Sequence, residues 1–500
     1  MHWDYLWSRA LELMEMRWES LFLTGKAGTG KSTLLKQFLD TTKKNVVNLA
    51  STGIAAVNTG WSTIHSFFRL HPNIKIDEVE PIRWENLDVL EEADIIVIDE
   101  VSMVRADLLD CVSKCINLSL TGKDDLPFGG KQMIFIWDLF QLAPIVSYEE
   151  QKAFKGLYKS EYFFSAKTYG ELNPKVIELQ KVYRQEEQDF IDILNKIRIW
   201  IVEEKDLDYI NKNIIKDMDS LESGTIVLTT TNADANTINQ KRLAELDTEI
   251  HFSEAEVEWK VPKSFYPNSI DLNYKVWAQI MMLKNTSDRK NGSIGKVLEV
   301  FDDVVMVEID EEEYEVELYE WKIFKHSFNK KTKKIITDTV GTFTQFPFKL
   351  AWGITIHKSQ WLTFDNLCVD FGKRVFAKWQ AYVALSRAVT TNWLFLKRAV
   401  VEKDVKIDKR VLWFMGKALI QQKVDMINYA IEQEREVEFT YIKSETEVSR
   451  RKIIPQMVDK AQYKWFEFMA LQAFDQEENK SKLFSVNKMH DIKLLSEYYS

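Results

Sequence analysis

The chain is poor in glycine and cysteine. Of its 500 residues only 17 are glycine and 3 are cysteine, whereas tryptophan, normally a rare residue, occurs 16 times. An odd, small number of cysteines excludes a disulfide framework. Cys111 and Cys115 lie four residues apart in a helix-like stretch without a partner His or Cys nearby, so we expect a buried or idle pair and no metal site.

Long apolar runs and a strong positive charge are also lacking. No run approaches the roughly 18 apolar residues that a membrane-spanning helix needs, and residues 1–4 begin no positively charged signal sequence. We therefore expect a cytoplasmic protein with no membrane partner. The net charge of −10 does not favour nucleic-acid binding, although local basic patches can still provide it. A chain of 500 residues is too long for one core, which predicts several domains.

A phosphate-binding loop is the strongest motif. Residues 25–32 fit the pattern G-x-x-x-x-G-K-[ST] and lie between a strand-like run at 21–23 and a helix-like run at 33–40. In such a loop the backbone N–H groups face the phosphates, Lys31 supplies a positive charge and Ser32 offers a hydroxyl to Mg²⁺. An ordinary glycine-rich turn is the alternative, which these flanks disfavour. The expected ATP-binding residues are Gly25, Ala27, Gly28, Thr29, Gly30, Lys31, Ser32 and Thr33.

Two acids end the next apolar strand, at 94–98. An acid at the carboxyl end of a parallel strand can hold Mg²⁺, and its neighbour can orient or deprotonate the attacking water. We assign the first role to Asp99 and the second to Glu100. A third apolar strand, at 132–136, precedes Gln141, which can reach a γ-phosphate.

The pattern of strands and helices restarts later in the chain. A strand at 226–232 begins a second α/β series, and short alternating strands between about 262 and 340 predict a small inserted β barrel. The basic segment 322–334 interleaves lysines with aromatic residues, which suits either a base-stacking surface or a solvated hairpin. The α/β pattern resumes at 351–360 and 380–387, where an arginine pointed across the cleft would stabilise phosphoryl-transfer charge.

In order along the chain, the motifs resemble the Pif family of superfamily-one DNA helicases, in the RecD-like branch, from about residue 15 to 400. The matching segments are 25–33, 50–56, 63–68, 98–103, 138–142, 183–185, 355–360 and 382–387.

This resemblance implies two RecA-like domains that close on ATP and Mg²⁺, with Lys31, Glu100, Gln141, Arg184 and Arg387 as the catalytic set. It implies 5′ to 3′ movement on single-stranded DNA and unwinding of duplex, structured or forked DNA, in replication, repair, recombination or telomere-like maintenance in a bacterial cell. The implied DNA-contacting residues are Thr52, Gly53, His65, Ser66, Phe67, His357, Lys358 and Ser359. We expect a monomer, with a single-stranded-DNA-binding protein or replication and repair factors as candidate partners.

The last hundred residues resemble a different module. Segments at 430–441, 450–455, 469–475 and 482–488 are similar to a WYL domain, a small β-barrel module associated with ligand or nucleic-acid binding. A packing module without a ligand is the alternative. The expected domains are therefore a first RecA-like domain at 1–174, a second in two parts at 175–261 and 341–400, the inserted barrel at 262–340, and a linker helix with the WYL-like domain at 401–500.

Several tryptophans stand where these motifs carry glycine. They include Trp137, Trp277, Trp361 and Trp379, and Trp61, Trp200, Trp259, Trp393 and Trp465 look similar. An indole is a poor replacement where a turn needs positive φ. Our hypothesis is that the source reads UGA as glycine and that these codons were translated as tryptophan.

Two other functions remain as alternatives. One is a single-strand translocase or protein remover that unwinds little. The other is a nucleotide-gated single-stranded-DNA-binding protein without turnover, against which the retention of Lys31, Glu100, Arg184 and Arg387 argues.

Overall fold

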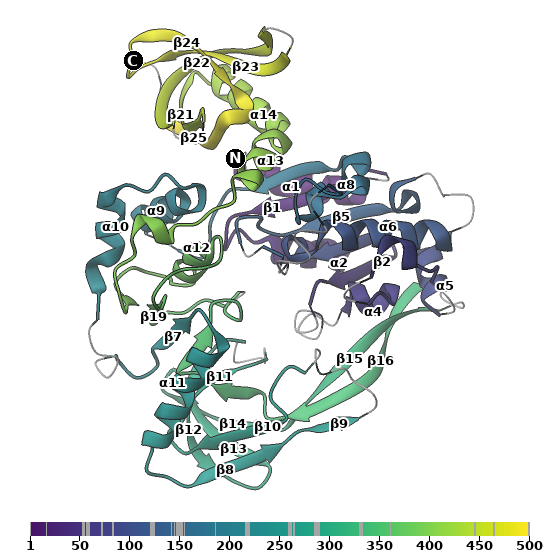
Figure 1. Ribbon diagram of the computed structural model, residues 1–500, viewed down its shortest axis with the longest axis vertical. Helices are drawn as coiled ribbons and strands as arrows, with labels where there is room; N and C mark the ends of the chain where they lie inside the picture. The colour runs from purple at the N-terminus through teal and green to yellow at the C-terminus, as the bar shows by residue number, and fades with distance from the viewer. Residues whose placement is uncertain are drawn as a thin grey trace.

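The computed structural model describes most of the chain, and Figure 1 shows the inserted strands at one end of the molecule and the C-terminal module at the other, beyond the first domain. The described residues are all except 1, 17, 53–55, 57–60, 72–73, 83–84, 121–125, 142, 145, 147–153, 155, 186, 216–220, 259–262, 264–265, 285–290, 330–333, 361, 445–446, 464–465 and 499–500. Within these described ranges, no helix has both the length and the apolar character that crossing a membrane requires.

A six-stranded parallel sheet forms the first domain. Its strand order is β3-β2-β4-β5-β1-β6, and the strands are β1 (Leu21–Gly25), β2 (Val46–Ala50), β3 (Ser62–Thr63), β4 (Ile95–Asp99), β5 (Gln132–Ile136) and β6 (Lys175–Leu179). The helices of this part are α1 (His2–Glu15), α2 (Lys31–Thr41), α4 (Ile64–Phe68), α5 (Glu85–Glu92), α6 (Ala106–Ser119) and α8 (Lys167–Leu172).

Both faces of this sheet are buried, which explains its nearly continuous apolar strands. Leu21 and Leu23 of β1 share one core with α1 and α2, while Phe22 shares the opposite core with Leu109 of α6. The parallel strands all end at the same edge. The loop after β1 and the acids at the end of β4 therefore meet there.

A second parallel sheet, with the order β18-β7-β19-β20, forms the core of the next domain. Its strands are β7 (Ile226–Thr229), β18 (Gly353–Thr355), β19 (Leu367–Asp370) and β20 (Leu394–Leu396), and its helices include α9 (Gln188–Ile199), α10 (Glu204–Ile210), α11 (Asn232–Glu245) and α12 (Gln380–Leu385). This domain completes the RecA-like core of two parallel sheets that the sequence predicts.

Antiparallel strands are inserted between β7 and β18. They form a five-stranded sheet, β14-β13-β12-β11-β17, a three-stranded sheet, β15-β16-β9, and the pair β10-β8. The strands are β8 (Ile250–Glu254), β9 (Glu256–Glu258), β10 (Asp271–Lys275), β11 (Gln279–Met282), β12 (Ile294–Val300), β13 (Val304–Ile309), β14 (Glu312–Glu317), β15 (Tyr319–Asn329), β16 (Lys334–Gln345) and β17 (Phe348–Leu350). The long β15–β16 hairpin extends back to the first domain (Figure 1), where Ser62 Oγ donates to the Phe324 carbonyl oxygen at 3.4 Å. The side chains at 325–337, which include most of the basic segment 322–334, lie outside the described residues.

Strand pairing corrects three of the expected boundaries. β6 pairs in parallel with β1, Leu21 opposite Lys175, so the first domain extends past residue 174. β8 pairs with β10 and β9 with β16, so the insertion begins before 262, and β17 pairs with β11, so it ends after 340. Sequence alone placed these boundaries wrongly because the pairing partners are distant in the chain.

The C-terminal module consists of two helices and an antiparallel sheet. The helices α13 (Lys409–Ala418) and α14 (Ile420–Glu432) lead into a sheet of order β24-β23-β22-β21-β25. Its strands are β21 (Arg435–Ile442), β22 (Val448–Tyr463), β23 (Phe466–Asp475), β24 (Lys480–Ser485) and β25 (Met489–Tyr498). Figure 1 shows this module above the first domain, with α13 and α14 between its sheet and that domain.

Candidate functional site

The phosphate loop joins β1 to α2 and has the backbone shape that its glycines allow. Gly28 and Gly30 have φ of 76° and 81°, and a Cβ at Gly28 would lie 2.6 Å from Arg184 Cβ, so only glycine fits there. Lys31 Nζ donates to the carbonyl oxygens of Gly25 and Lys26 at 2.9 and 3.0 Å. Burial lowers the pKa of Lys31 to about 8, opposed by the nearby Asp138.

The acids at the end of β4, Asp99 and Glu100, are buried beside this loop. Burial raises the pKa of Asp99 to about 6, while the Lys31 ammonium lowers it. Glu100 has φ of 56°, and its Oε2 accepts a 2.9 Å hydrogen bond from Ser51 Oγ. Ser32 is exposed at the start of α2, as is Thr33. The hydroxyl of Ser32 and the carboxylate of Asp99 are oxygen donors of the kind that Mg²⁺ prefers, so these residues fit the expected cation.

Asp138, which follows β5, lies in a buried ionic network. Arg198 of α9 pairs with Asp138 at 3.1 Å and with Glu178 of β6 at 3.0 Å, and its guanidinium lies 3.9 Å from the Phe140 ring centroid. Gln141 is buried, and its backbone N–H donates to the Asp138 carbonyl oxygen at 3.1 Å. The network thus fixes the segment that carries the expected γ-phosphate sensor.

The second domain reaches the loop through α12. Tyr382 OH accepts a 3.3 Å hydrogen bond from the Ala27 N–H and donates to Asp138 Oδ2 at 3.4 Å. A hydroxyl of the second domain therefore contacts a loop N–H of the kind that binds phosphate.

Both expected arginines lie close to this contact. Arg184 Nη1 donates to the Ser386 carbonyl oxygen at 3.2 Å. Arg387 is buried, with Nε donating to the Val383 carbonyl oxygen at 3.0 Å, and burial together with Arg184 lowers the pKa of Arg387. In this conformation both guanidiniums hydrogen-bond to carbonyl groups of the second domain.

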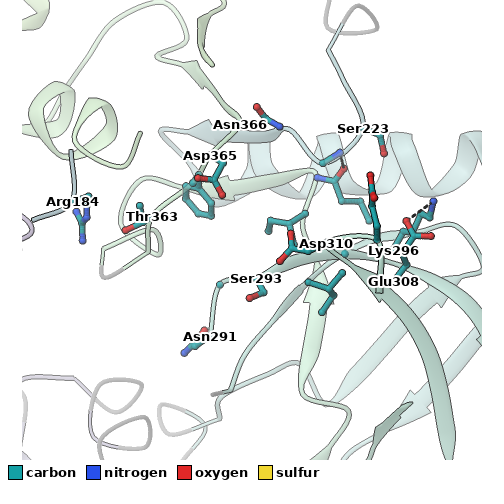
Figure 2. A pocket seen from close by; sticks show the side chains of 18 of the residues that line it. Arg184, Ser223, Asn291, Ser293, Lys296, Glu308, Asp310, Thr363, Asp365 and Asn366 are labelled. Carbon is teal, nitrogen blue, oxygen red and sulfur yellow. Dashed lines mark hydrogen bonds and ion pairs between the residues drawn. The ribbon is translucent and has the colours of Figure 1, made fainter. Parts of the chain in front are cut away.

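A cleft of about 1720 Å³ opens from the loop between the domains (Figure 2). Gly28, Gly30 and Arg184 line one side, Thr363 and Asp365 line the second domain's side, and the inserted sheet contributes residues such as Lys296 and Glu308. Figure 2 shows Arg184 apart from the inserted strands, where Lys296 pairs with Glu308 at 2.9 Å. The cleft is large enough for a nucleotide.

The expected DNA-contacting residues come from both domains. Thr52 and His65 of the first domain and His357 of the second are half-buried, and Ser66 and Lys358 are exposed, whereas Gly53 lies outside the described residues. Burial lowers the pKa of both histidines. Phe67 and Ser359 are buried, and Ser359 Oγ donates to the Ile356 carbonyl oxygen at 2.9 Å. Contact between a DNA strand and either of these two side chains would require the site to open.

Four tryptophans have the left-handed backbone that favours glycine. Trp18, Trp200, Trp277 and Trp379 have φ of 78°, 61°, 71° and 56°. Trp200, Trp277 and Trp379 are among the positions where the sequence motifs suggest glycine. Trp18 is not, and only its backbone conformation suggests glycine there. Trp137 is buried, and Trp361 lies outside the described residues.

Sequence reasoning missed several residues of the site. The sequence motifs assign no role to Arg198 or Tyr382, and they do not predict the ion pair between Lys26 of the loop and Asp491 near the C-terminus. Arg198 is a basic residue at a buried position of an amphipathic helix, a signal that could have pointed to a buried partner. The other contacts join residues hundreds of positions apart.

The comparisons with known proteins agree with this geometry. A family model described as PIF1-like helicase matches residues 11–206. The chain is 30% identical over 423 residues to the ATP-dependent DNA helicase Pif1 of Bdellovibrio bacteriovorus, covering 81% of this chain and 90% of that protein. It is 31% identical over 451 residues to the human ATP-dependent DNA helicase PIF1, covering 84% of this chain but only 65% of that protein.

Solved structures of a Bacteroides Pif1 are also similar. The complex with ADP-AlF4 has a TM-score of 0.76 at 31% identity, covering 83% of this chain and 97% of that chain. The unliganded structure gives 0.75 at 32% identity, with 83% and 96% covered. The structure bound to single-stranded DNA gives 0.61 at 32% identity, with 83% and 97% covered. The arrangement of this chain is therefore nearer to those two structures than to the DNA-bound one.

Proposed function

Because the chain belongs to the PIF1-like helicase family, we propose that it is an ATP-dependent DNA helicase that moves 5′ to 3′ on single-stranded DNA. The observation that carries this proposal is the convergence of charged groups on one loop. Lys31 lies in the loop, Arg184 packs against Gly28, and Asp138 is joined to the loop through Tyr382, whose hydroxyl contacts both the Ala27 N–H and Asp138 Oδ2. Such a set is suited to binding and hydrolysing a nucleoside triphosphate.

Five residues in and around the loop have roles in hydrolysis: Lys31, Ser32, Asp99, Glu100 and Gln141. Lys31 leaves the carbonyl oxygens of Gly25 and Lys26 to bind the β- and γ-phosphates, while the loop N–H groups hold their oxygens. Ser32 and Asp99 would hold Mg²⁺, which neutralises phosphate charge when bound. Glu100 accepts a proton from the attacking water, and Gln141 senses the γ-phosphate.

Closure of the cleft brings the arginines to the nucleotide. Arg184 and Arg387 exchange their bonds to Ser386 and Val383 for the γ-phosphate, where an arginine is worth roughly 10³ to 10⁵ in rate. Tyr382 withdraws from Ala27 when phosphate takes its place. Nucleotide binding and domain position are thereby linked.

The DNA strand lies across both domains. It contacts Thr52, Gly53, His65, Ser66 and Phe67 of the first domain and His357, Lys358 and Ser359 of the second. The lower similarity to the DNA-bound Bacteroides structure supports a change of domain arrangement when DNA binds, which would open the surroundings of Phe67 and Ser359. Alternate tightening of the two domains on the strand then produces net movement.

The finer assignments are part of the same proposal. The inserted antiparallel strands form a small β barrel, and the C-terminal module is a WYL-like domain that binds single-stranded DNA or regulates the motor. The protein acts as a cytoplasmic monomer on forked DNA in replication, repair or recombination, with a single-stranded-DNA-binding protein or repair factors as partners.

The test is ATP hydrolysis by the full chain with and without single-stranded DNA, compared with a Glu100→Gln variant. We expect DNA-stimulated turnover in the parent and a loss of about 10² to 10⁴ in the variant, because a general base is removed. Fork substrates with a single 5′ or 3′ tail should be unwound only from the 5′ tail.

DNA binding without turnover in the parent would contradict the proposal and favour the nucleotide-gated binder. Turnover with displacement of streptavidin from DNA but little unwinding would instead favour the translocase.

A further inference from the structure

The C-terminal module contacts the phosphate loop directly. Lys26 Nζ, in the loop, lies 2.9 Å from Asp491 Oδ1, in β25. The side chains are only 11% and 18% exposed, so the ion pair is largely shielded from solvent. A charge-assisted hydrogen bond in such a place is stronger and more restrictive than one on the surface.

Asp491 reaches the loop through a local distortion of β25. His490 pairs with Thr440 and Lys493 with Glu438, so Asp491 and Ile492 together oppose the single residue Phe439. This is a β-bulge, and Asp491 has φ of 47°, which is costly for a residue other than glycine. A bulge redirects a side chain out of the regular alternation of a strand. The carboxylate is here directed to Lys26.

Other contacts hold the module against the first domain and against α9 of the second domain. Gln422 of α14 accepts from the Glu178 N–H at 2.9 Å and donates to the Glu178 carbonyl oxygen at 3.0 Å. Lys493 pairs with Asp192 of α9 at 2.6 Å. Glu178 belongs to β6, the neighbour of the strand that leads into the loop. Asp491 is thus presented by a frame that is anchored to the same sheet as the loop.

Lys26 is also bonded within the loop. Its carbonyl oxygen accepts from Lys31 Nζ at 3.0 Å and from Thr29 Oγ1 at 2.9 Å. Asp491 therefore holds the side chain of Lys26, and the backbone of Lys26 in turn holds Lys31, the lysine that must bind the phosphates. Fixing the Lys26 side chain restricts the backbone of the loop before nucleotide arrives, which favours binding by preorganisation.

We infer that Asp491 is a positioning residue for the phosphate loop, through which the C-terminal module tightens nucleotide binding by the motor. The inference rests on the proposed ATP hydrolysis only for its kinetic readout. It assigns the module an effect on the nucleotide site that does not require the module to bind any ligand.

The experiment uses the full chain and the variant Asp491→Asn, in which the charge is removed and the shape kept. Asparagine tolerates left-handed φ at least as well as aspartate, so the bulge should persist. The matched control is Asp459→Asn on β22 of the same module, whose exposed carboxylate accepts only from the adjacent Lys460 N–H, at 2.6 Å, among the described contacts. The dissociation constant of a fluorescent ADP is measured without DNA, and KM and kcat for ATP with saturating single-stranded DNA.

We expect Asp491→Asn to weaken ADP binding and to raise KM for ATP by roughly fivefold, since part of the energy of a charge-assisted hydrogen bond is transmitted to the nucleotide. The kcat should stay within about twofold, because the group does not touch the reacting atoms. Lys26→Gln should have a similar effect, and the double variant should be no worse than either single variant. Asp459→Asn should match the parent.

A lower thermal midpoint with unchanged ADP binding and KM would overturn the inference, since the contact would then only attach the module. Additive effects of Lys26→Gln and Asp491→Asn would overturn it as well. Should Asp491→Asn not fold, Lys26→Gln tests the same ion pair from the loop. If the parent binds ADP but lacks DNA-stimulated turnover, the proposed function fails, while the ADP measurement still decides the role of Asp491.

Discussion

Ser51 Oγ donates a 2.9 Å hydrogen bond to Glu100 Oε2. Ser51 follows β2 and Glu100 follows β4, and these strands pair with Ala50 opposite Asp99. The proposed general base is therefore tied to the segment that begins the proposed DNA contact at Thr52, whose Oγ1 lies 3.5 Å from the same Glu100 oxygen. DNA binding at this segment can change how Glu100 is held.

Replacing Ser51 by alanine should release Glu100 in the absence of DNA. We expect the DNA-independent hydrolysis rate to rise by about tenfold, because a hydrogen bond to a charged group is worth roughly 1.5–3 kcal/mol, and the stimulation by DNA to fall correspondingly. The measurement is the ATP hydrolysis rate across a titration of single-stranded DNA. Thr237→Ala, which removes an exposed hydroxyl on α11, is the control. A Ser51→Ala variant with the parent's stimulation ratio would show that this hydrogen bond does not restrain Glu100.

The Tyr382 hydroxyl competes with phosphate for the Ala27 N–H. Removing it in Tyr382→Phe should lower KM for ATP without DNA by about threefold, because a neutral hydrogen bond contributes roughly 0.5–1.5 kcal/mol. The ring stays, so packing of α12 is kept. Steady-state kinetics measure the effect, and a raised KM would mean that the hydroxyl supports the loop and does not obstruct it.

Sequence reasoning found the parts of the site that are local in the chain. The loop at 25–32 and the acids at 99–100 follow from spacing alone, because the chemistry needs those residues at the end of a strand. The family assignment built on these motifs is confirmed by the comparisons. The expected buried state of Cys111 and Cys115 is also confirmed, and burial raises the pKa of both thiols to about 12.

Contacts between distant segments could not be found in that way. Arg198 is paired with Asp138 and Glu178 only after α9 packs against the first sheet. The side chain of Asp491 points at Lys26 only because β25 has a bulge. No residue pattern in β25 predicts that bulge. Such pairings depend on tertiary packing, which propensity and spacing do not determine.

Lys423 of α14 should make stability depend on pH. Burial lowers its pKa to about 7, with Glu178 opposing, whereas in the unfolded chain the pKa returns to the ordinary value near 10.4. Between these two values the unfolded chain binds the extra proton, so this group makes stability rise from about pH 7 towards pH 10. Below about pH 7 both states are protonated and the folded protein bears the full cost of the buried charge.

The variant Lys423→Met keeps the aliphatic shape without the charge. We expect its thermal midpoint to exceed that of the parent at pH 7 and the difference to shrink at pH 9, where the parent lysine is neutral. Differential scanning fluorimetry at both pH values measures this, and Lys417→Met on α13 serves as the control. A pH-independent difference between the two proteins would show that Lys423 does not titrate in this range.

The tryptophans with positive φ give the last prediction. Trp200 ends α9 in the left-handed conformation, the place where helices favour glycine, and Trp277 lies exposed in the turn before β11. Restoring glycine should stabilise the protein by about 1 kcal/mol at each of these two positions, because a side chain with left-handed φ carries a penalty of that order. Trp413, in the interior of α13, provides the opposite case, since glycine there should cost about 1 kcal/mol.

Thermal midpoints of Trp200→Gly, Trp277→Gly and Trp413→Gly measure these opposite signs. The coding DNA gives an independent result: UGA is expected at Trp200, Trp277 and Trp379, and UGG at Trp413. UGG at all four codons would contradict the UGA hypothesis.

Trp379 is a stricter test of the protein itself, because its indole is buried and donates to the Arg198 carbonyl oxygen at 3.1 Å. If glycine is the native residue there, the Trp379→Gly protein should hydrolyse ATP faster with DNA, since α12 carries Tyr382 and leads into Arg387, whose approach to the nucleotide a bulky buried ring would restrict.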